Sequence, residues 1–254
     1  MKNATEYAKK FKKFVRKLPQ AEVVTNEDGV IGEVIYSHLL WNADKKQATA
    51  AYKKLINSAV DLNDIRMNHI FETVDLIGSN YPRAQERAKR LRSVLNAIYK
   101  REHDVVVDSI DGAGKRDVRE YFETLNGITP FVCNRVIAFC YDVSVMPIDE
   151  RTLAVMVDND LLHEDITVSE AASWLSRQVK SDDVCNVHTR LHSWVETQQI
   201  VFAVKPNKKK KTTKKKASKK KVAKKKTSKK KVAKKITSKK KVAKKSTKKK
   251  TKKK

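Results

Sequence analysis

Residues 125–130 combine amino-acid types that let a polypeptide backbone bind an anion. Gly127 can adopt the left-handed conformation that follows a helix, and Thr129 with Pro130 is a favourable N-cap and first position for the next helix. Backbone N–H groups at such a hairpin point outward and can hold a phosphate. The same residues also suit an ordinary connection between helices, so both interpretations stay open. The predicted phosphate contacts are Asn126, Gly127, Ile128 and Thr129.

Residues 208–254 are a second candidate binding segment, which acts through charge alone. They contain 29 lysines, no arginine and no acidic residue, whereas residues 1–207 hold 28 basic and 29 acidic residues. Ser218, Ser228 and Ser238 mark a repeat with one Val-Ala pair per unit, which is too little apolar surface to build a core. We therefore predict a disordered tail over residues 206–254, with a composition that resembles the tails of linker histones and lysine-rich bacterial histone-like proteins.

Lysine contacts to phosphate release condensed counterions, so the tail is expected to bind DNA without sequence preference and with a steep salt dependence. RNA, an acidic membrane surface, an acidic protein and a nuclear import receptor are alternatives that the tail alone does not separate. The tail lysines chosen as representative DNA contacts are Lys208, Lys214, Lys224, Lys234 and Lys244.

Cysteine and histidine residues give a weak indication of a metal site. Cys133 and Cys140 lie seven positions apart on a predicted helix, which favours buried thiols over a disulfide. Cys185, His188 and His192 have the chemistry of zinc ligands, but a structural zinc site usually needs four. We predict no metal.

Residues 1–207 have the apolar content and periodicity of an all-α body. No apolar run approaches the roughly 20 residues of a membrane span, and residues 1–18 are expected to pack on the body as a basic helix rather than lie on a membrane. Only residues 200–204 show a short strand-like stretch. Further helices are predicted over residues 31–40, 45–58, 64–77, 83–100, 117–124, 131–141 and 150–157.

Several stretches, taken in order, carry a resemblance. The first two stretches are residues 32–40 and the set Ile77-Gly78, Tyr81 and Arg83-Ala84. They are followed by Leu125-Asn126-Gly127-Ile128-Thr129 and then, at a helix-length interval, by Pro147-Ile148-Asp149-Glu150-Arg151. Over about residues 30–157 this pattern resembles the helix-hairpin-helix DNA glycosylase superfamily, with endonuclease III as the familiar example. The resemblance implies two helical lobes with DNA across the cleft between them. Residues 30–135 would form the central lobe, and residues 1–29 with 145–205 the second lobe of a body spanning residues 1–205.

The resemblance also implies a reaction. In that family a target base is flipped into the cleft, and an aspartate after the second hairpin helix supports cleavage of the N-glycosidic bond. Asp149 matches that position, where a carboxylate can stabilise positive charge on the sugar or activate water. Asp149 can equally serve as the N-cap of the helix over residues 150–157.

Two departures from the family limit what is carried over. The position of the Schiff-base lysine of bifunctional members is occupied by Phe131, and no lysine occurs between Lys115 and Lys180, so the covalent lyase route is in doubt. Only Cys185 follows Asp149, so we predict that the four-cysteine iron–sulfur cluster of endonuclease III is absent.

Other DNA contacts are expected near the hairpin and in the loop after residue 40. Thr129 replaces the second hairpin glycine of the family, which weakens the expected grip on phosphate. The residue that fills the space of the flipped base would fall near Asn42 or Ala43, and Trp41 could wedge into the duplex or simply pack.

We therefore predict a monofunctional DNA N-glycosylase of base-excision repair that binds double-stranded DNA and is tethered by its tail. It is expected to be an intracellular, DNA-associated monomer, in a nucleoid or a nucleus, with no obligate protein partner. The alternative is a catalytically inactive DNA-binding or chromatin-organising protein on the same scaffold.

Overall fold

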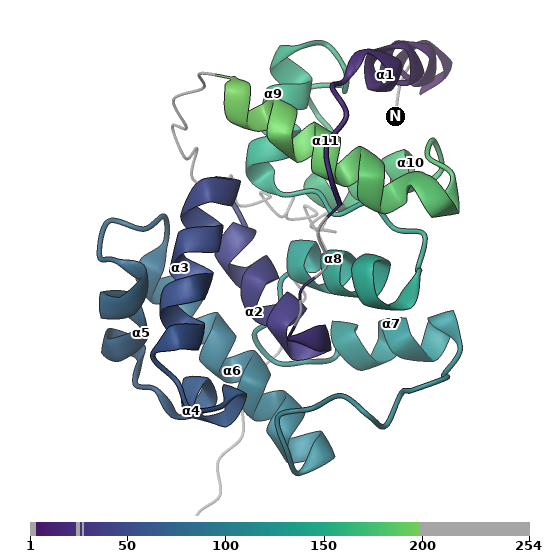
Figure 1. Ribbon diagram of the computed structural model, residues 1–254. Helices are drawn as coiled ribbons and strands as arrows, with labels where there is room; N and C mark the ends of the chain where they lie inside the picture. Colours follow the sequence, from purple (N-terminus) through teal and green to yellow (C-terminus); the bar gives the residue numbers. More distant parts are fainter. Residues whose placement is uncertain (1–3, 24–25, 27, 199–254) are drawn as a thin grey trace, which may run out of the picture. The chain divides into compact units, whose positions relative to one another are not determined.

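The computed structural model describes residues 4–23, 26 and 28–198. These residues form eleven α-helices and one short 3-10 turn, with no strand among them, as the sequence predicts (Figure 1). The strand-like stretch at 200–204 and the tail contacts Lys208, Lys214, Lys224, Lys234 and Lys244 lie outside the described residues. The helices are α1 (Ala4–Lys17), α2 (Gly29–Leu40), α3 (Lys45–Asn57), α4 (Leu62–Met67), α5 (Ile70–Ile77), α6 (Ala84–Glu102), α7 (Lys115–Glu123), α8 (Pro130–Tyr141), α9 (Glu150–Asp158), α10 (Val168–Ser176) and α11 (Val184–Thr197).

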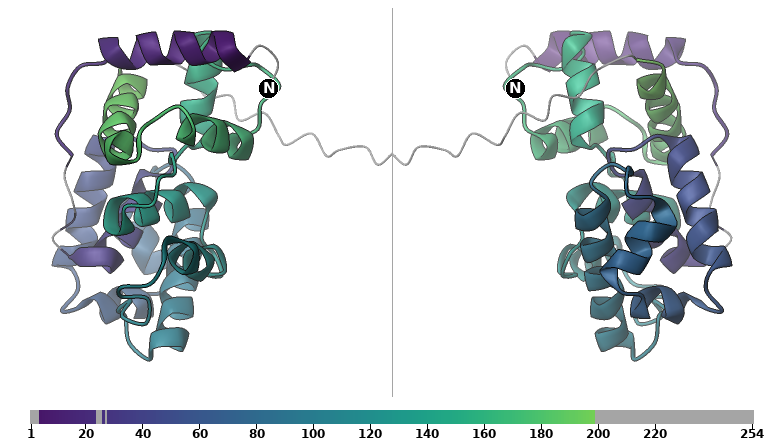
Figure 2. Two further views of the ribbon diagram at one scale, coloured as in Figure 1. Left: turned by 90° about the vertical axis from the view of Figure 1, so that its right-hand side faces the viewer. Right: turned by 90° about the vertical axis from the view of Figure 1, so that its left-hand side faces the viewer.

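Two hydrophobic cores divide the described residues into two lobes. The first core is built from α2 to α8 and extends to Val145, with Val184 of α11 added. The second core joins Phe11 and Leu18 to α9, α10 and α11. Figure 2 shows α1 together with α9, α10 and α11 at one end of these residues and α2 to α8 at the other. None of the helices in the described part is long and apolar enough to cross a membrane.

The α2 helix lies at the centre of the first lobe because it is apolar on all sides. Nine of its twelve residues are buried, including the polar Glu33, Ser37 and His38. It packs mainly against α8 and α3. The loop 41–44 follows its C-terminal end and contacts the start of α9 in the second lobe. A helix buried in this way fixes the residues at its C-terminal end.

The single helix predicted over residues 64–77 is wrong. The α4 helix ends at Met67, Asn68 leaves the helical conformation, and His69 is extended before α5 begins. The His69 N–H donates to the Glu72 carboxylate at 2.6 Å, which starts a new helix at the point where the first one stops. Because Met67 and Phe71 are exposed, their apolar side chains provide no packing that would hold one continuous helix.

Candidate nucleic-acid interface

The hairpin between α7 and α8 has the local conformations that its sequence predicts. Gly127 has a φ of 95°, in the left-handed region that favours glycine. The Val132 N–H donates to Thr129 Oγ1 at 3.2 Å, so Thr129 caps α8 with Pro130 in its first turn. The α7 helix ends at Glu123, and Leu125 is buried as the turn begins.

Gly127 is also held by close packing against α6. A Cβ atom at this position would lie 2.7 Å from Ser93 Cβ and 2.9 Å from the Arg90 carbonyl oxygen. The Arg90 guanidinium reaches the Gly127 carbonyl oxygen at 3.5 Å. Glycine is therefore required here twice, for its backbone conformation and for the space that α6 leaves.

The hairpin leaves backbone donors open. Within the described residues, the N–H groups of Asn126, Gly127 and Thr129 donate to no backbone carbonyl, whereas the Ile128 N–H donates to the Leu125 carbonyl at 3.3 Å. Asn126 is exposed and Gly127 is half-buried. An unsatisfied N–H group beside a helix N-terminus attracts an anion. Of the four predicted phosphate contacts, Asn126 and Gly127 thus offer an accessible free backbone donor, whereas Thr129 is buried.

Arginines of α6 and the residue before it surround Trp41. The guanidinium carbons of Arg83, Arg87 and Arg90 lie 4.8, 5.8 and 5.5 Å from its ring centre. Arg87 is fully buried and donates to the carbonyl oxygens of His38 and Trp41, and burial lowers its pKa to about 10. The side chains of Arg83 and Arg90 stay partly exposed. Trp41 is buried, so it packs in this structure.

The loop after α2 is fastened to the start of α9. Asn42 has a φ of 53°, and its backbone N–H donates to Asp149 Oδ2 at 2.8 Å. Its side-chain amide donates to Glu150 Oε2 at 2.6 Å and accepts from the Arg151 N–H at 3.1 Å. Trp41 Nε1 donates to the same Glu150 oxygen at 3.2 Å. The structure thus joins the predicted loop residue Asn42 directly to the predicted catalytic residue Asp149.

Asp149 is the N-cap of α9. Its Oδ1 accepts the Thr152 N–H at 2.8 Å, while Oδ2 accepts the Asn42 N–H. Only 1% of the residue is exposed. The carboxylate is therefore occupied by two backbone donors, and its catalytic role stays a prediction.

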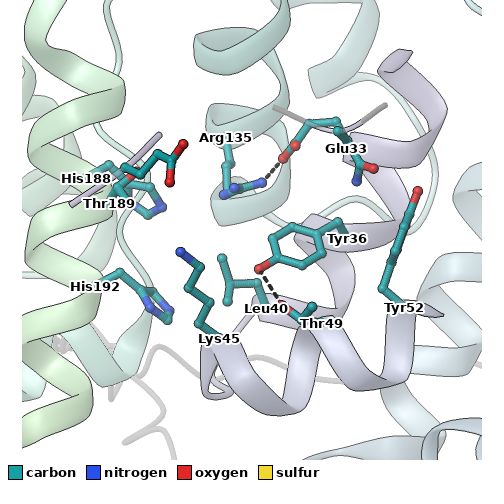
Figure 3. A pocket seen from close by; sticks show the side chains of 12 residues that line it. Glu33, Tyr36, Leu40, Lys45, Thr49, Tyr52, Arg135, His188, Thr189 and His192 are labelled. Carbon is teal, nitrogen blue, oxygen red and sulfur yellow. Dashed lines mark hydrogen bonds and ion pairs between the residues drawn. The ribbon is translucent and has the colours of Figure 1, made fainter. Parts of the chain in front are cut away.

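A cavity of about 260 Å³ lies between α2, α3, α8 and α11 (Figure 3). Its polar wall contains a buried ion pair between Glu33 and Arg135, and Ser37 bonds to both partners. Burial lowers the pKa of Arg135 to about 9, a value at which the guanidinium is still charged at neutral pH. His188 is buried on the opposite wall, where its Nδ1 lies 3.2 Å from the Pro147 carbonyl oxygen. Burial, and then the charge of Arg135, lowers the pKa of His188 well below its usual value.

The sequence does not reveal this cavity, because its lining residues come from four helices far apart in the chain. One signal was present: Glu33 and Arg135 are each the sole charged residue in a nearly continuous apolar helix. Burying a charged side chain without a partner of opposite charge costs free energy. An acidic and a basic residue, each alone in an apolar helix, therefore indicate an ion pair between those helices.

The cysteines do not fit an iron–sulfur cluster of the endonuclease III kind. The chain has three cysteines, and such a cluster needs about four thiolates. Among the described residues all three are free thiols, and Cys133 is buried on α8. Cys185 Sγ donates to the Ala138 carbonyl, whereas His192 pairs with Glu196. The candidate zinc ligands Cys185, His188 and His192 therefore have separate partners.

Neither a protein-family model nor a curated protein matches this sequence. Solved structures do match its fold. A trapped endonuclease III–DNA covalent intermediate superposes with a TM-score of 0.57 and 16% identity, over 76% of this chain and 86% of that chain. A thermostable thymine-DNA glycosylase gives 0.53 and 15%, over 76% and 86%. The Helicobacter pylori 3-methyladenine DNA glycosylase bound to 1,N6-ethenoadenine gives 0.51 and 15%, over 76% and 95%.

At these identities the comparison shows the fold. These enzymes share the all-α architecture of the described residues. The body of this chain therefore has the helix-hairpin-helix DNA glycosylase fold.

Proposed function

We propose that this chain binds double-stranded DNA through the α7–α8 hairpin and the arginines beside it. The observation that carries the proposal is the pair of open N–H groups at Asn126 and Gly127, where the Arg90 guanidinium reaches the Gly127 carbonyl oxygen. Backbone donors and a guanidinium together suit a phosphate. Endonuclease III and the Clostridium acetobutylicum 8-oxoguanine glycosylase/lyase have this fold in complexes with DNA, which supports the proposal.

The test is Arg90→Ala in a chain that lacks residues 208–254, so that the tail does not dominate the affinity. Binding is expected to weaken to a similar degree on all duplex sequences, and the salt slope is expected to fall by about one. Lys100→Ala is the matched control, since it lies on α6 about 15 Å further along the helix axis. Equal effects of the two substitutions would contradict the proposal.

We further propose that residues 208–254 tether the body to DNA. Each phosphate that the tail neutralises adds about 0.9 to the slope of log affinity against log salt on B-form DNA. Deleting the segment is therefore expected to flatten that slope strongly. A slope that the deletion leaves unchanged would refute the tether.

As the finer function, we propose a DNA N-glycosylase that acts without a lysine at residue 131. Asp149 would supply the carboxylate, which lies against the loop that carries Asn42. Phe131 is buried and has no nucleophile, so the proposal is limited to base release. Neighbours of the same fold are named as glycosylases of 8-oxoguanine, thymine and 3-methyladenine, which supports this choice.

The second candidate is a DNA-binding protein that has no glycosylase activity. The burial of Asp149 and the two backbone donors on its carboxylate favour this candidate, because a catalytic carboxylate must reach the sugar or a water molecule. A binding protein of this kind would contact DNA through the same hairpin and arginines as the proposed glycosylase, but it would not release a base.

One assay separates the two candidates. Free base is measured after incubation with duplexes that carry uracil, oxidised pyrimidine, alkylated purine or mismatched adenine. Base release that Asp149→Asn abolishes, and that Asp158→Asn at the far end of α9 preserves, supports the glycosylase. No release from any duplex supports the binding protein. Strand nicking is unsuitable as the readout, because the tail amines can cleave abasic sites themselves.

A further inference from the structure

Positive charge is concentrated in the N-terminal helix α1. Residues 1–17 hold seven basic residues and one acidic residue, whereas residues 18–207 hold 21 basic and 28 acidic residues. The near-neutral charge of residues 1–207 therefore combines a positive N-terminal segment with a negative remainder. A polyanion that approaches these residues is attracted to the first and repelled by the second.

The basic residues of α1 share one face of the helix. Five of them follow the spacing i, i+3, i+4, i+7 and i+8, and all five are exposed. Within the described residues none of the five has a hydrogen bond or an ion pair, whereas Lys10, outside this spacing, pairs with Glu6 at 3.1 Å and with Asp160 at 2.6 Å. We call the five the cationic face: Lys9, Lys12, Lys13, Arg16 and Lys17.

The opposite face of α1 is apolar and is already packed on the second core. The centre of the Phe11 ring lies 6.3 Å from the centre of the Trp174 ring on α10. The centre of the Phe14 ring lies 4.6 Å from that of Trp194 on α11. Arg190 of α11 donates to carbonyl oxygens at the C-terminal end of α1. A helix that binds at a membrane surface inserts its apolar face into the lipid, and α1 in this position has no apolar face left to insert.

The cationic face therefore points outward, away from α10 and α11. Figure 2 shows α1 at the outer end of the second lobe, with α2 to α8 at the opposite end. The hairpin belongs to the first lobe, since Leu125 and Phe131 are part of its core. The cationic face and the hairpin thus belong to different lobes and share no residue.

We propose that the cationic face of α1 is a second surface that binds the phosphates of duplex DNA, separate from the hairpin. The face covers residues 9–17, which span about 12 Å along the helix axis. Duplex DNA carries one negative charge per about 1.7 Å of its axis, so about seven phosphate charges lie along the same length. The helix is already folded and packed, so binding orders only its exposed side chains. One body would then contact two stretches of DNA at once.

This inference depends neither on the hairpin contact nor on base release, and lysine acetylation of the full-length chain tests it. The reactivity of each lysine is compared by mass spectrometry with and without a saturating short duplex. Lys12, Lys13 and Lys17 are expected to be protected by the duplex, whereas the exposed Lys53 and Lys54 of α3 stay reactive. Protection in α1 that is no greater than protection in α3 would overturn the inference.

Arg90→Ala separates this surface from the hairpin. Protection of Lys12 and Lys13 is expected to persist in this variant, and its loss would overturn the inference. Protected α1 lysines beside hairpin amides that DNA leaves unprotected would contradict the proposed hairpin contact and keep this inference intact. Vesicles that contain phosphatidylserine are the competing probe: protection by vesicles but not by the duplex would overturn the inference in favour of a membrane surface.

Charge removal measures how much the cationic face contributes to affinity. Lys12→Gln together with Lys13→Gln should lower the slope of log affinity against log salt by about two, because two phosphate partners are lost. Lys53→Gln together with Lys54→Gln is the matched control, since these are also adjacent exposed lysines of a helix, and it should leave the slope unchanged. Equal slopes for the two double variants would overturn the inference.

Discussion

The hairpin and the loop after α2 contact neighbouring parts of α6 but use their polar groups in opposite ways. The hairpin leaves N–H groups of Asn126 and Gly127 without a protein acceptor. The loop commits the backbone and both side-chain amide atoms of Asn42 to Asp149, Glu150 and Arg151. The hairpin can bind an external anion as it stands, whereas the loop after α2 must first break its internal hydrogen bonds before its polar groups can contact a ligand. Under the proposed function, DNA can therefore bind at the hairpin while the Asp149 carboxylate is still bonded to the Asn42 and Thr152 N–H groups.

The largest effect is expected where the hairpin meets α6. Gly127→Ala combines a strained backbone with overlap against Ser93 and Arg90, and it should cost about 2–5 kcal/mol of unfolding free energy. Gly112→Ala is the matched control, because Gly112 has a φ of 72° and open space around its Cβ direction. It should cost only the strain, about 1–3 kcal/mol. Urea unfolding measures both, and equal costs would mean that α6 does not constrain the hairpin.

The free energy of unfolding is expected to depend on pH through His38, which is buried in α2 just before the loop 41–44. Burial lowers the pKa of His38 from 6.5 to about 4. Between pH 6.5 and pH 4, His38 is therefore protonated in the unfolded chain but neutral in the folded chain. The contribution of the neutral His38 to stability is complete above about pH 6.5 and is lost as the pH falls toward 4. The loss amounts to roughly 3 kcal/mol.

Unfolding free energies at about pH 7.5 and about pH 4.5 check this expectation. His38→Gln should lower the difference between the two conditions, whereas His103→Gln, at an exposed position, should not. His188 contributes in the same direction, because its pKa is also lowered by burial. A wild-type chain with the same stability at both pH values would contradict the neutral, buried state of His38.

The closed state of Asp149 is tested by removing its carboxylate. Asp149→Ala loses two backbone hydrogen bonds to a buried charged acceptor and should cost about 2–3 kcal/mol. Asp61→Ala removes an exposed N-cap carboxylate that, among the residues the structure describes, accepts the Asp64 N–H alone, and should cost about 1 kcal/mol. If thermal or urea unfolding gives the same cost for both, the bond from Asn42 to Asp149 contributes no stability.

The smallest effect is expected at Asn42. Asn42→Gly keeps the left-handed backbone and removes only the side-chain bonds to Glu150 and Arg151. It should cost about 0.5–1 kcal/mol. If the loop restrains Asp149, the same variant should also raise hydrogen exchange at the Thr152 amide. Unchanged hydrogen exchange at the Thr152 amide would mean that the loop does not restrain the N-cap of α9.

Local chemistry made the hairpin predictable from sequence, since glycine, threonine and proline each act on neighbouring backbone. The N-cap position of Asp149 follows from the same kind of signal. The burial of Asp149 and the cavity between α2, α3, α8 and α11 depend on contacts between helices far apart in the chain, which spacing does not encode. The break at Asn68 was missed because the apolar residues 65–77 fit a helical period across it.

Amide hydrogen exchange with and without a short DNA duplex tests the central claim most directly. The amides of Asn126 and Gly127 should exchange fast in the free protein and become protected when DNA binds, while the Asn42 amide is protected in both states. Hairpin amides that exchange equally fast in the presence of bound DNA would contradict the hairpin as the phosphate site.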